Sequence, residues 1–368
     1  MHREDEPASV SAALAQQIRQ DIAAAGGWWP FDRFMAAALY MPGLGYYAHG
    51  GVKFGWSPES GSDFVTAPEI SPLFGHTVAV QVAQVLDATG LAEVVEFGAG
   101  TGALAQQLLE ALGDRCARYT IVELSASLRQ RQQQRLAAFG ERVRWVDALP
   151  EGIEGVVVGN EVLDAMPVQL LHWDGTQWLE RGVAVDEWKF VFADRPTELR
   201  PPVEGPFVPG TVTEIHPQAR AFIATLAEKL QRGAAFFIDY GFPEAEYYHP
   251  QRHGGTLMCH RAHQADTDPL SDVGLKDITA HVDFTGIALA GQDAGLDVLG
   301  YTSQGHFLMN CGLAERLAQA GVRERTMAQK LMQEHEMGEL FKVIGFGRGL
   351  PEGFDPIGFV HGDRSHRL

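Results

Sequence analysis

Apolar residues along the chain occur either at helical spacing or in short continuous runs. Stretches of the two kinds alternate, which predicts alternating helices and strands. Continuous apolar runs between helical stretches are typical of parallel strands buried on both faces. The helical spacing predicts helices at 9–25, 30–40, 71–89, 102–112, 125–138, 217–231, 282–294 and within 311–337. The apolar runs predict strands at 93–97, 118–123, 143–146, 155–159, 234–238, 296–300 and 341–346. We therefore expect an α/β fold built on a parallel sheet.

Three stretches interrupt this rhythm. Residues 41–68 are irregular and rich in Gly and Pro, 168–216 contain a hairpin and further antiparallel strands, and 241–280 form a second irregular insert. Inserts that follow strand ends lie at the carboxyl edge, where open α/β sheets bind ligands, so we expect them to roof the site. The predicted parts are 1–90 (N-terminal helices and cover loop), 91–167 (first part of a Rossmann-like core), 168–216 (antiparallel β insert) and 217–368 (the remaining core, with the 241–280 loop insert).

The most informative segment is a buried strand, a glycine-rich turn and a helix start over residues 94–105. Gly98, Gly100 and Gly102 each remove a Cβ where a backbone must turn sharply or approach a ligand. A helix N-terminus just beyond the turn presents free N–H groups. The spacing fits a dinucleotide pattern for NAD, and it also fits Glu-x-Gly-x-Gly-x-Gly of S-adenosylmethionine-dependent methyltransferases.

Three carboxylates favour S-adenosylmethionine over NAD. Glu96 precedes the first glycine by two residues, which suits a methionine ammonium and would repel a pyrophosphate. Glu123 ends the next strand, where it could accept hydrogen bonds from a ribose diol, and Asp147 ends the third, near an adenine amino group. The acid after the second strand is common to both families, so Glu96 and Asp147 decide the preference. No metal is expected in this site.

Charge and cysteine content narrow the partners. The chain has 29 basic and 47 acidic residues and a net charge of −18, which argues against nucleic acid and anionic membranes and is compatible with a basic substrate. Cys116, Cys259 and Cys311 form neither a disulfide framework nor a zinc motif. The acidic N-terminus lacks the apolar segment of a secretory or transit peptide, so these features predict a cytoplasmic location.

Candidate transfer residues follow the strand at 155–159. If a helical turn begins there, Glu161 and Asp164 share a face and could grip a guanidinium in bidentate fashion, which leaves one nitrogen able to attack. A guanidinium cannot usefully be deprotonated beforehand. Asn160 alone suggests a different role, in which an amide carbonyl orients a neutral amine, and Asn160 or Asp164 could also simply cap a helix.

Further candidates lie in three other segments. Asp63 and Glu69 lie in the loop at 63–71, Tyr240 follows a strand end, and Asp283 comes near a helix start, so each could contact the acceptor. His281 is a possible proton acceptor, although a single histidine is more often structural.

These motifs together resemble the MidA-like methyltransferases, whose relatives include a mitochondrial complex I assembly factor. The specific parts are Asn160-Glu161-x-x-Asp164-Ala165-x-Pro167 and the segment 277–284, which add to the glycine motif. The resemblance implies a class I methyltransferase fold and methyl transfer from S-adenosylmethionine to an arginine of a protein, with a respiratory-complex subunit as a candidate acceptor. A methyltransferase for a small-molecule amine or hydroxyl, and a non-catalytic assembly factor that binds the cofactor, remain alternatives.

Overall fold

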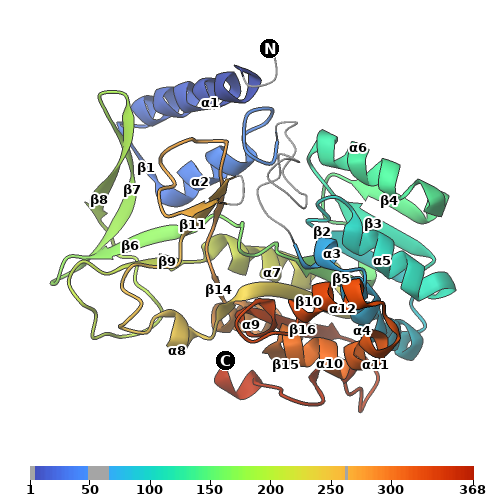
Figure 1. The fold of residues 1–368 in the computed structure, drawn as a ribbon. Helices are drawn as coiled ribbons and strands as arrows, with labels where there is room; N and C mark the ends of the chain where they lie inside the picture. The colour runs from blue at the N-terminus through green and yellow to red at the C-terminus, as the bar shows by residue number, and fades with distance from the viewer. Residues whose placement is uncertain (1–4, 49–65, 262–263) are drawn as a thin grey trace. The chain divides into compact units, whose positions relative to one another are not determined.

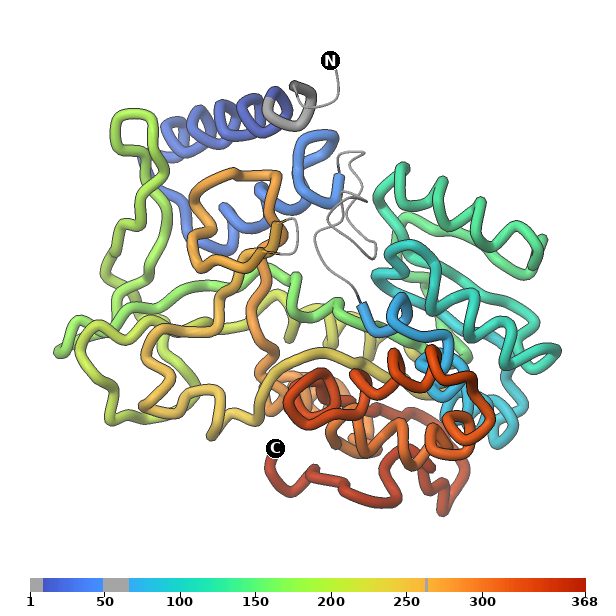
Figure 2. The backbone as a smooth tube through the Cα atoms, viewed as in Figure 1, coloured from blue at the N-terminus to red at the C-terminus, as the bar shows by residue number. Residues whose placement is uncertain are grey.

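The computed structural model describes residues 5–48, 66–261 and 264–368, with the side chains of residues 5–8 left out. The chain divides into two compact units. The first unit combines 1–64, 164–219 and 242–283, and the second combines 65–163, 220–241 and 284–368. Each unit therefore draws on stretches that are far apart in the sequence, as the colours of the chain trace show (Figure 2).

The second unit is built on a twisted sheet in the order β15-β16-β10-β5-β2-β3-β4 (Figure 1). Its strands are β2 (Glu93–Phe97), β3 (Arg118–Val122), β4 (Val143–Val146), β5 (Ile153–Asn160), β10 (Leu230–Phe242), β15 (Asp297–Ser303) and β16 (Phe341–Arg348). The pairs from β4 to β10 are parallel, as predicted. β16 differs, because it runs antiparallel to both β10 and β15. It can do so because β15 ends and β16 begins at the same edge, so no crossover is needed.

Helices cover both faces of this sheet. One apolar core combines α4 and α5 with strand residues such as Val94 and Val158. On the other face Phe222 of α7 packs edge-on against Phe97 and Phe237, with ring centroids 5.1 and 5.8 Å apart. The helices of this unit are α3 (Ala67–Ile70), α4 (Leu73–Thr89), α5 (Ala103–Leu112), α6 (Ala126–Arg135), α7 (Pro217–Lys229), α9 (Phe284–Asp293), α10 (Gln304–Asn310), α11 (Leu313–Gln319), α12 (Val322–Gln329) and α13 (Met337–Leu340). Helix α7 begins in the first unit and belongs to the second unit from residue 220 onward.

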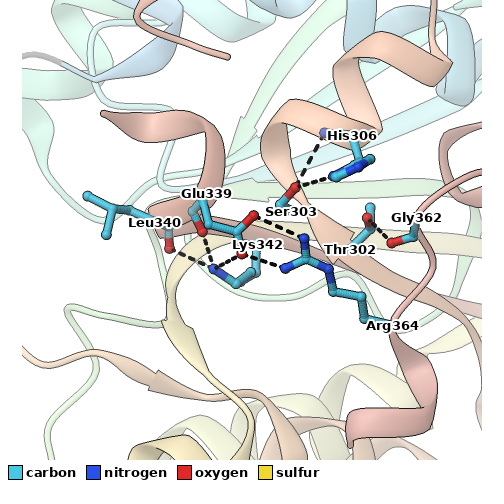
Figure 3. Close-up of polar contacts among 8 residues, drawn as sticks. All are labelled: Thr302, Ser303, His306, Glu339, Leu340, Lys342, Gly362 and Arg364. Carbon is cyan, nitrogen blue, oxygen red and sulfur yellow. Dashed lines mark hydrogen bonds and ion pairs between the residues drawn. The ribbon is translucent and has the colours of Figure 1, made fainter. Parts of the chain in front are cut away.

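The C-terminal tail is fixed to the sheet through α13 (Figure 3). The Arg364 guanidinium binds the Glu339 carboxylate through both of its terminal nitrogens. The buried Lys342 ammonium donates to the main-chain oxygens of Glu339 and Leu340, so it caps α13 at its C-terminal end. These bonds fix the start of β16.

The first unit contains antiparallel sheets and two N-terminal helices, α1 (Asp5–Ala24) and α2 (Phe31–Tyr40). The larger sheet has the order β1-β7-β6-β9, and β8 pairs with β7. Its strands are β1 (Trp28–Pro30), β6 (Gln169–Trp173), β7 (Trp178–Asp186), β8 (Lys189–Pro196) and β9 (Val212–Ile215). The predicted hairpin is confirmed, because Trp173 pairs with Trp178 across the turn. The helices pack on this sheet through Phe31, Phe34 and Leu170.

The insert at 241–280 is less irregular than predicted. It begins with the short helix α8 (Glu244–Tyr247) and continues into a small sheet in the order β12-β11-β13. The strands are β11 (Met258–Arg261), β12 (Gln264–Asp266) and β13 (Asp277–Thr279), and β14 (Val282–Asp283) follows them. Strands of two to four residues carry too little periodic signal to be recognised in a sequence. The four-part division of the chain stays a prediction.

Candidate functional site

The glycine turn between β2 and α5 adopts a backbone that favours glycine. Gly98, Gly100 and Gly102 have φ values of 63°, 52° and 82°, in the left-handed region. A Cβ on Gly98 would lie 2.8 Å from Cγ2 of Val162, so the turn packs directly on the chain that follows β5. Helix α5 begins at Ala103, immediately after the turn. The predicted strand–turn–helix unit is therefore confirmed, with its free helix N–H groups beside the glycines.

Glu123, at the end of β3, is buried with both carboxylate oxygens already oriented. Oε1 accepts the Ser125 backbone N–H at 2.8 Å, and Oε2 accepts Gln132 Nε2 at 2.9 Å. Burial raises the pKa of Glu123, whereas these two hydrogen bonds act to lower it. Because each oxygen retains a further lone pair, the carboxylate can accept two hydroxyl groups of a ribose.

Glu96, the last residue but one of β2, is buried. Its Oε2 accepts the Tyr119 hydroxyl at 2.7 Å inside the sheet, and only 2% of the residue is exposed. Burial, with a smaller contribution from the nearby charge of Glu123, raises the pKa of Glu96 to about 8, although the hydrogen bond from Tyr119 acts to lower it. The carboxyl group is then mostly protonated at neutral pH, so it does not supply the fixed negative charge that the sequence suggested for an ammonium group. Any direct contact of Glu96 with a cofactor stays a prediction.

Asp147 lies at the mouth of a pocket at the ends of β3 and β4. The pocket has a volume of about 330 Å³ and is lined by Leu124, Ala126, Arg129, Gln130, Gln133 and Asp147. The Asp147 carboxylate is paired with Arg129, and 78% of its side chain is exposed. Leu124 is also 78% exposed, which leaves a large apolar side chain at the pocket for a flat ring to cover. This arrangement fits an adenine beside Asp147.

The chain just after β5, residues 160–163, is here named the acceptor loop. Asn160 is buried, and its Nδ2 donates to Glu161 Oε1 at 2.9 Å. Its Oδ1 is also buried and has no hydrogen-bond partner within the described part of the chain. Glu161 has φ of 54°, a strained value for a residue with a Cβ, and its N–H donates to the Ile238 carbonyl at 2.9 Å. Strain and an unpaired buried acceptor in one short loop are typical of a functional site.

Asp239 holds the acceptor loop in place, and sequence reasoning did not assign it that function. Its Oδ2 accepts the backbone N–H groups of Val162 and Leu163 at 3.1 and 2.9 Å, and Oδ1 accepts that of Tyr240 at 3.0 Å. The signal was an acid at the end of a buried strand. Tyr240, the next residue, packs edge-on against Phe341 at 5.3 Å.

The helical turn predicted after β5 is wrong. Residues 161–168 form bends and a turn but no helix in this described segment, so Glu161 and Asp164 do not share a helix face. The left-handed Glu161 breaks the helical path at its first residue. Asp164 belongs to the first unit, where its carbonyl accepts the Ala280 N–H at 3.0 Å. The two-carboxylate grip therefore loses the geometry on which it was based.

Glu69 is not placed as a free substrate ligand. Its carboxylate receives the Thr101 hydroxyl and the Arg135 guanidinium, the latter at 2.8 Å. Although burial acts to raise it, these two hydrogen bonds lower the pKa of Glu69. The carboxylate thus ties α3 to the glycine turn, and its predicted contact with the acceptor stays a prediction.

The remaining candidates lie in the first unit or outside the described residues. The His281 ring stacks on Phe242 at 5.2 Å, and its carbonyl accepts His216 Nε2 at 3.0 Å. Asp283 is buried, and Asp63 lies outside the described residues. Their catalytic and acceptor-binding functions stay predictions.

Metal-binding clusters and membrane-spanning helices are both absent from the described ranges. No group of three or more His, Cys, Asp or Glu side chains in residues 5–48, 66–261 and 264–368 is arranged to hold a metal ion. No helix in these ranges combines the length and apolar character needed to cross a membrane.

The strand order, the glycine turn after β2 and the acid after β3 define a class I, Rossmann-like methyltransferase fold. The profile of a family described as "Putative S-adenosyl-L-methionine-dependent methyltransferase" matches residues 77–302, and the chain belongs to this family. A solved structure from Burkholderia thailandensis, described as a "likely methyl transferase" bound to S-adenosyl-homocysteine, is 52% identical with a TM-score of 0.95. The match covers 100% of this chain and 99% of that one. The protein is therefore an S-adenosylmethionine-dependent methyltransferase.

Curated relatives are more distant. The mitochondrial protein arginine methyltransferase NDUFAF7 of Danio rerio is 26% identical, over 84% of this chain and 79% of its own length. That of Homo sapiens is 27% identical, over 84% and 78%. Both are named as mitochondrial proteins, and this finding contradicts the cytoplasmic location predicted from the cysteines and the N-terminus. That signal was weak, because scattered cysteines indicate a reducing compartment without naming one.

Proposed function

We propose that the protein methylates an arginine side chain of another protein. The observation that carries the proposal is the acceptor loop, where the buried Asn160 Oδ1 has no partner among the described residues and lies one residue from the Glu161 carboxylate. A buried acceptor left unpaired costs about 1–3 kcal/mol, so it persists where a ligand supplies the missing donor. A guanidinium has five N–H donors and no acceptor, which matches an amide oxygen next to a carboxylate.

The residues present fit the cofactor. The glycine turn leaves room for its methionine portion, Glu123 can hold the ribose, and the pocket beside Asp147 and Leu124 suits the adenine. S-adenosylmethionine, when bound, supplies a methyl group made electrophilic by its sulfonium. Gly98 is in contact with Val162, so the turn and the acceptor loop lie against each other within the second unit.

The acceptor loop supplies orientation and charge. Hydrogen bonds from two guanidinium nitrogens to Glu161 and Asn160 would draw positive charge toward them and leave the third nitrogen with more lone-pair character. The carboxylate of Glu161 would also receive the proton that this nitrogen loses. Asp239 keeps the loop rigid by binding two of its N–H groups. The strain at Glu161 is then the cost of presenting this carboxylate.

Charge and relatives support the same acceptor. A net charge of −18 favours approach of a basic protein segment. The named relatives are protein arginine methyltransferases, but at 26–27% identity they leave the acceptor of this chain open. We include a subunit of a respiratory complex in the proposal as a candidate acceptor protein.

Mass spectrometry of cells with and without the gene tests the proposal. Loss of a methylarginine peptide, restored by the wild-type gene but not by Glu161→Gln, is the expected result. An altered metabolite with every methylarginine peptide intact would instead indicate a small-molecule acceptor. No change in either pool would indicate an assembly factor that binds the cofactor without transferring its methyl group.

A further inference from the structure

The buried side chain of Gln132 in α6 connects three segments that surround the cofactor. Its Nε2 donates one hydrogen to the Gly100 carbonyl and the other to Glu123 Oε2, both at 2.9 Å. Its Oε1 accepts the indole N–H of Trp145, on β4, at 3.0 Å. The residue has no exposed surface. All three hydrogen bonds are made by one amide, so neither a flipped nor a shorter side chain could replace it.

Gln132 belongs to a polar face of α6 that continues in both directions. Three residues earlier, Arg129 contacts the Asp147 carboxylate and the Glu123 carbonyl. Three residues later, Arg135 contacts Glu69 and Thr101 of the glycine turn. Residues at this spacing lie on one side of a helix. One helix face thereby contacts the ends of β3 and β4, the glycine turn and α3.

We propose that Gln132 is a positioning residue for S-adenosylmethionine, which sets the glycine turn and the Glu123 carboxylate at a fixed separation. The proposal rests on the cofactor site and not on the acceptor, so it is independent of the arginine assignment. We name the glycine turn at 98–102 together with Glu123 and Gln132 the cofactor cradle.

The Gln132 amide favours the ionised form of Glu123 and holds the Gly100 carbonyl in a fixed orientation. Without its N–H donor, one oxygen of the buried Glu123 would lose a bond, and burial would then favour the protonated carboxyl group. A protonated Glu123 offers the ribose one acceptor fewer. The Gly100 carbonyl would lose its partner in the same substitution and could rotate. The proposed sites for the methionine portion and the ribose are thus coupled through one side chain.

The test is calorimetric binding of S-adenosylhomocysteine to purified full-length protein, with no acceptor present. Gln132→Met keeps the length of the side chain and removes all three bonds, and we expect the dissociation constant to rise about tenfold or more. Gln134→Met is the matched control, because Gln134 is an exposed glutamine of the same helix. Thermal unfolding without ligand reports whether each variant is folded.

Gln132→Glu separates positioning from packing. At high pH its carboxylate repels Glu123 and cannot donate to Gly100, so binding should be weak. As the pH falls, the introduced carboxyl group gains a proton and can donate one hydrogen bond. Lowering the pH should therefore strengthen binding severalfold more in Gln132→Glu than in the wild type. A purely structural glutamine would give equal losses at both pH values.

The proposal is overturned if folded Gln132→Met binds S-adenosylhomocysteine as the wild type does, or if Gln132→Glu shows no recovery at low pH. Both results leave the arginine proposal unaffected, because they concern only the cofactor. Wild-type protein that does not bind S-adenosylhomocysteine at all would instead count against the cofactor assignment itself.

Discussion

The cofactor cradle and the acceptor loop are neighbours in the second unit, yet they are built in opposite ways. In the cradle, the buried polar groups of Glu123 and Gln132 have protein partners. In the acceptor loop, Asn160 Oδ1 has none in the described chain, and Glu161 is strained. A saturated network holds a shape before any ligand arrives, whereas a buried oxygen such as Asn160 Oδ1, with no partner among the described residues, can accept a hydrogen bond from a ligand. We infer that the cradle mainly sets affinity and the loop mainly sets the rate of transfer.

The largest effect is expected in the cradle, from Gly100→Val. The residue has φ of 52°, so a β-branched side chain is strained there, and we expect its atoms to take up space that the bound cofactor needs. Calorimetry should detect no binding of S-adenosylmethionine or S-adenosylhomocysteine. Gly140→Val is the control, because Gly140 has φ of 57° and open space around it, so it carries the strain alone. Equal loss of binding in both variants would show that backbone strain, and not the cradle, is responsible.

In the acceptor loop, Asn160→Leu should raise stability while it removes function. Leucine has a similar shape and removes the buried oxygen that has no partner among the described residues. This gain should exceed the loss of the Nδ2 hydrogen bond to the half-buried Glu161, so the free energy of unfolding without ligand should rise by roughly 1 kcal/mol. Methyl transfer should be lost. Urea unfolding and a transfer assay measure the two effects.

Asn310→Leu is the comparison variant. Asn310 Nδ2 donates to the carbonyls of Gly358 and His361, so removing these two hydrogen bonds should destabilise the protein. A destabilised Asn160→Leu variant would mean that its oxygen has a structural partner after all.

A smaller effect is expected from Glu123→Gln. The amide keeps the shape but can accept fewer hydrogen bonds from a ribose, so the KM for S-adenosylmethionine should rise about tenfold. The kcat at saturating cofactor should stay near normal, because the ribose is remote from the reacting carbon. A full cofactor titration gives both constants, and a fall in kcat with KM unchanged would contradict the comparison.

The smallest effect on binding and transfer is expected at Glu96, which instead changes how stability depends on pH. Since burial raises its folded pKa to about 8, the folded protein holds a proton that the unfolded chain releases above about pH 4.5. Wild-type stability should therefore fall between about pH 4.5 and 8, by up to about 1.4 kcal/mol per pH unit, and Glu96→Gln should flatten this slope. Melting temperatures across this range measure it, with the exposed Glu154→Gln as control. An unchanged slope in Glu96→Gln would show that Glu96 does not carry it.

The sequence predicted the core well where the signal is local and repeated. Continuous apolar runs identify β2, β3 and β5, and three glycines at fixed spacing identify the turn, because only glycine suits its φ values. The antiparallel direction of β16 and the three short strands at 258–279 were missed. The direction of a strand depends on the end of the sheet at which the preceding segment places the chain. That depends on how the whole unit packs and cannot be read from the strand's own residues.

The site was harder to predict because chemical type does not reveal hydrogen-bond partners. Glu69 was selected as an acid of the loop at 63–71 and Glu96 as the acid before the glycine motif, but Arg135 and Tyr119 form hydrogen bonds with them. Gln132 and Asp239 were not assigned a function, because a glutamine in a polar helix or an acid after a strand has many ordinary explanations. Only tertiary contacts distinguish a positioning residue from a surface one.

The most direct test of the division between cradle and loop is single-turnover methyl transfer by Glu161→Gln at saturating S-adenosylmethionine, with the acceptor identified by mass spectrometry. Removing one charge of a buried pair costs about 2–5 kcal/mol, so the rate should fall about thirtyfold or more while cofactor affinity stays within about twofold. A variant that transfers methyl groups at the wild-type rate would contradict the account and make the acceptor loop a structural element.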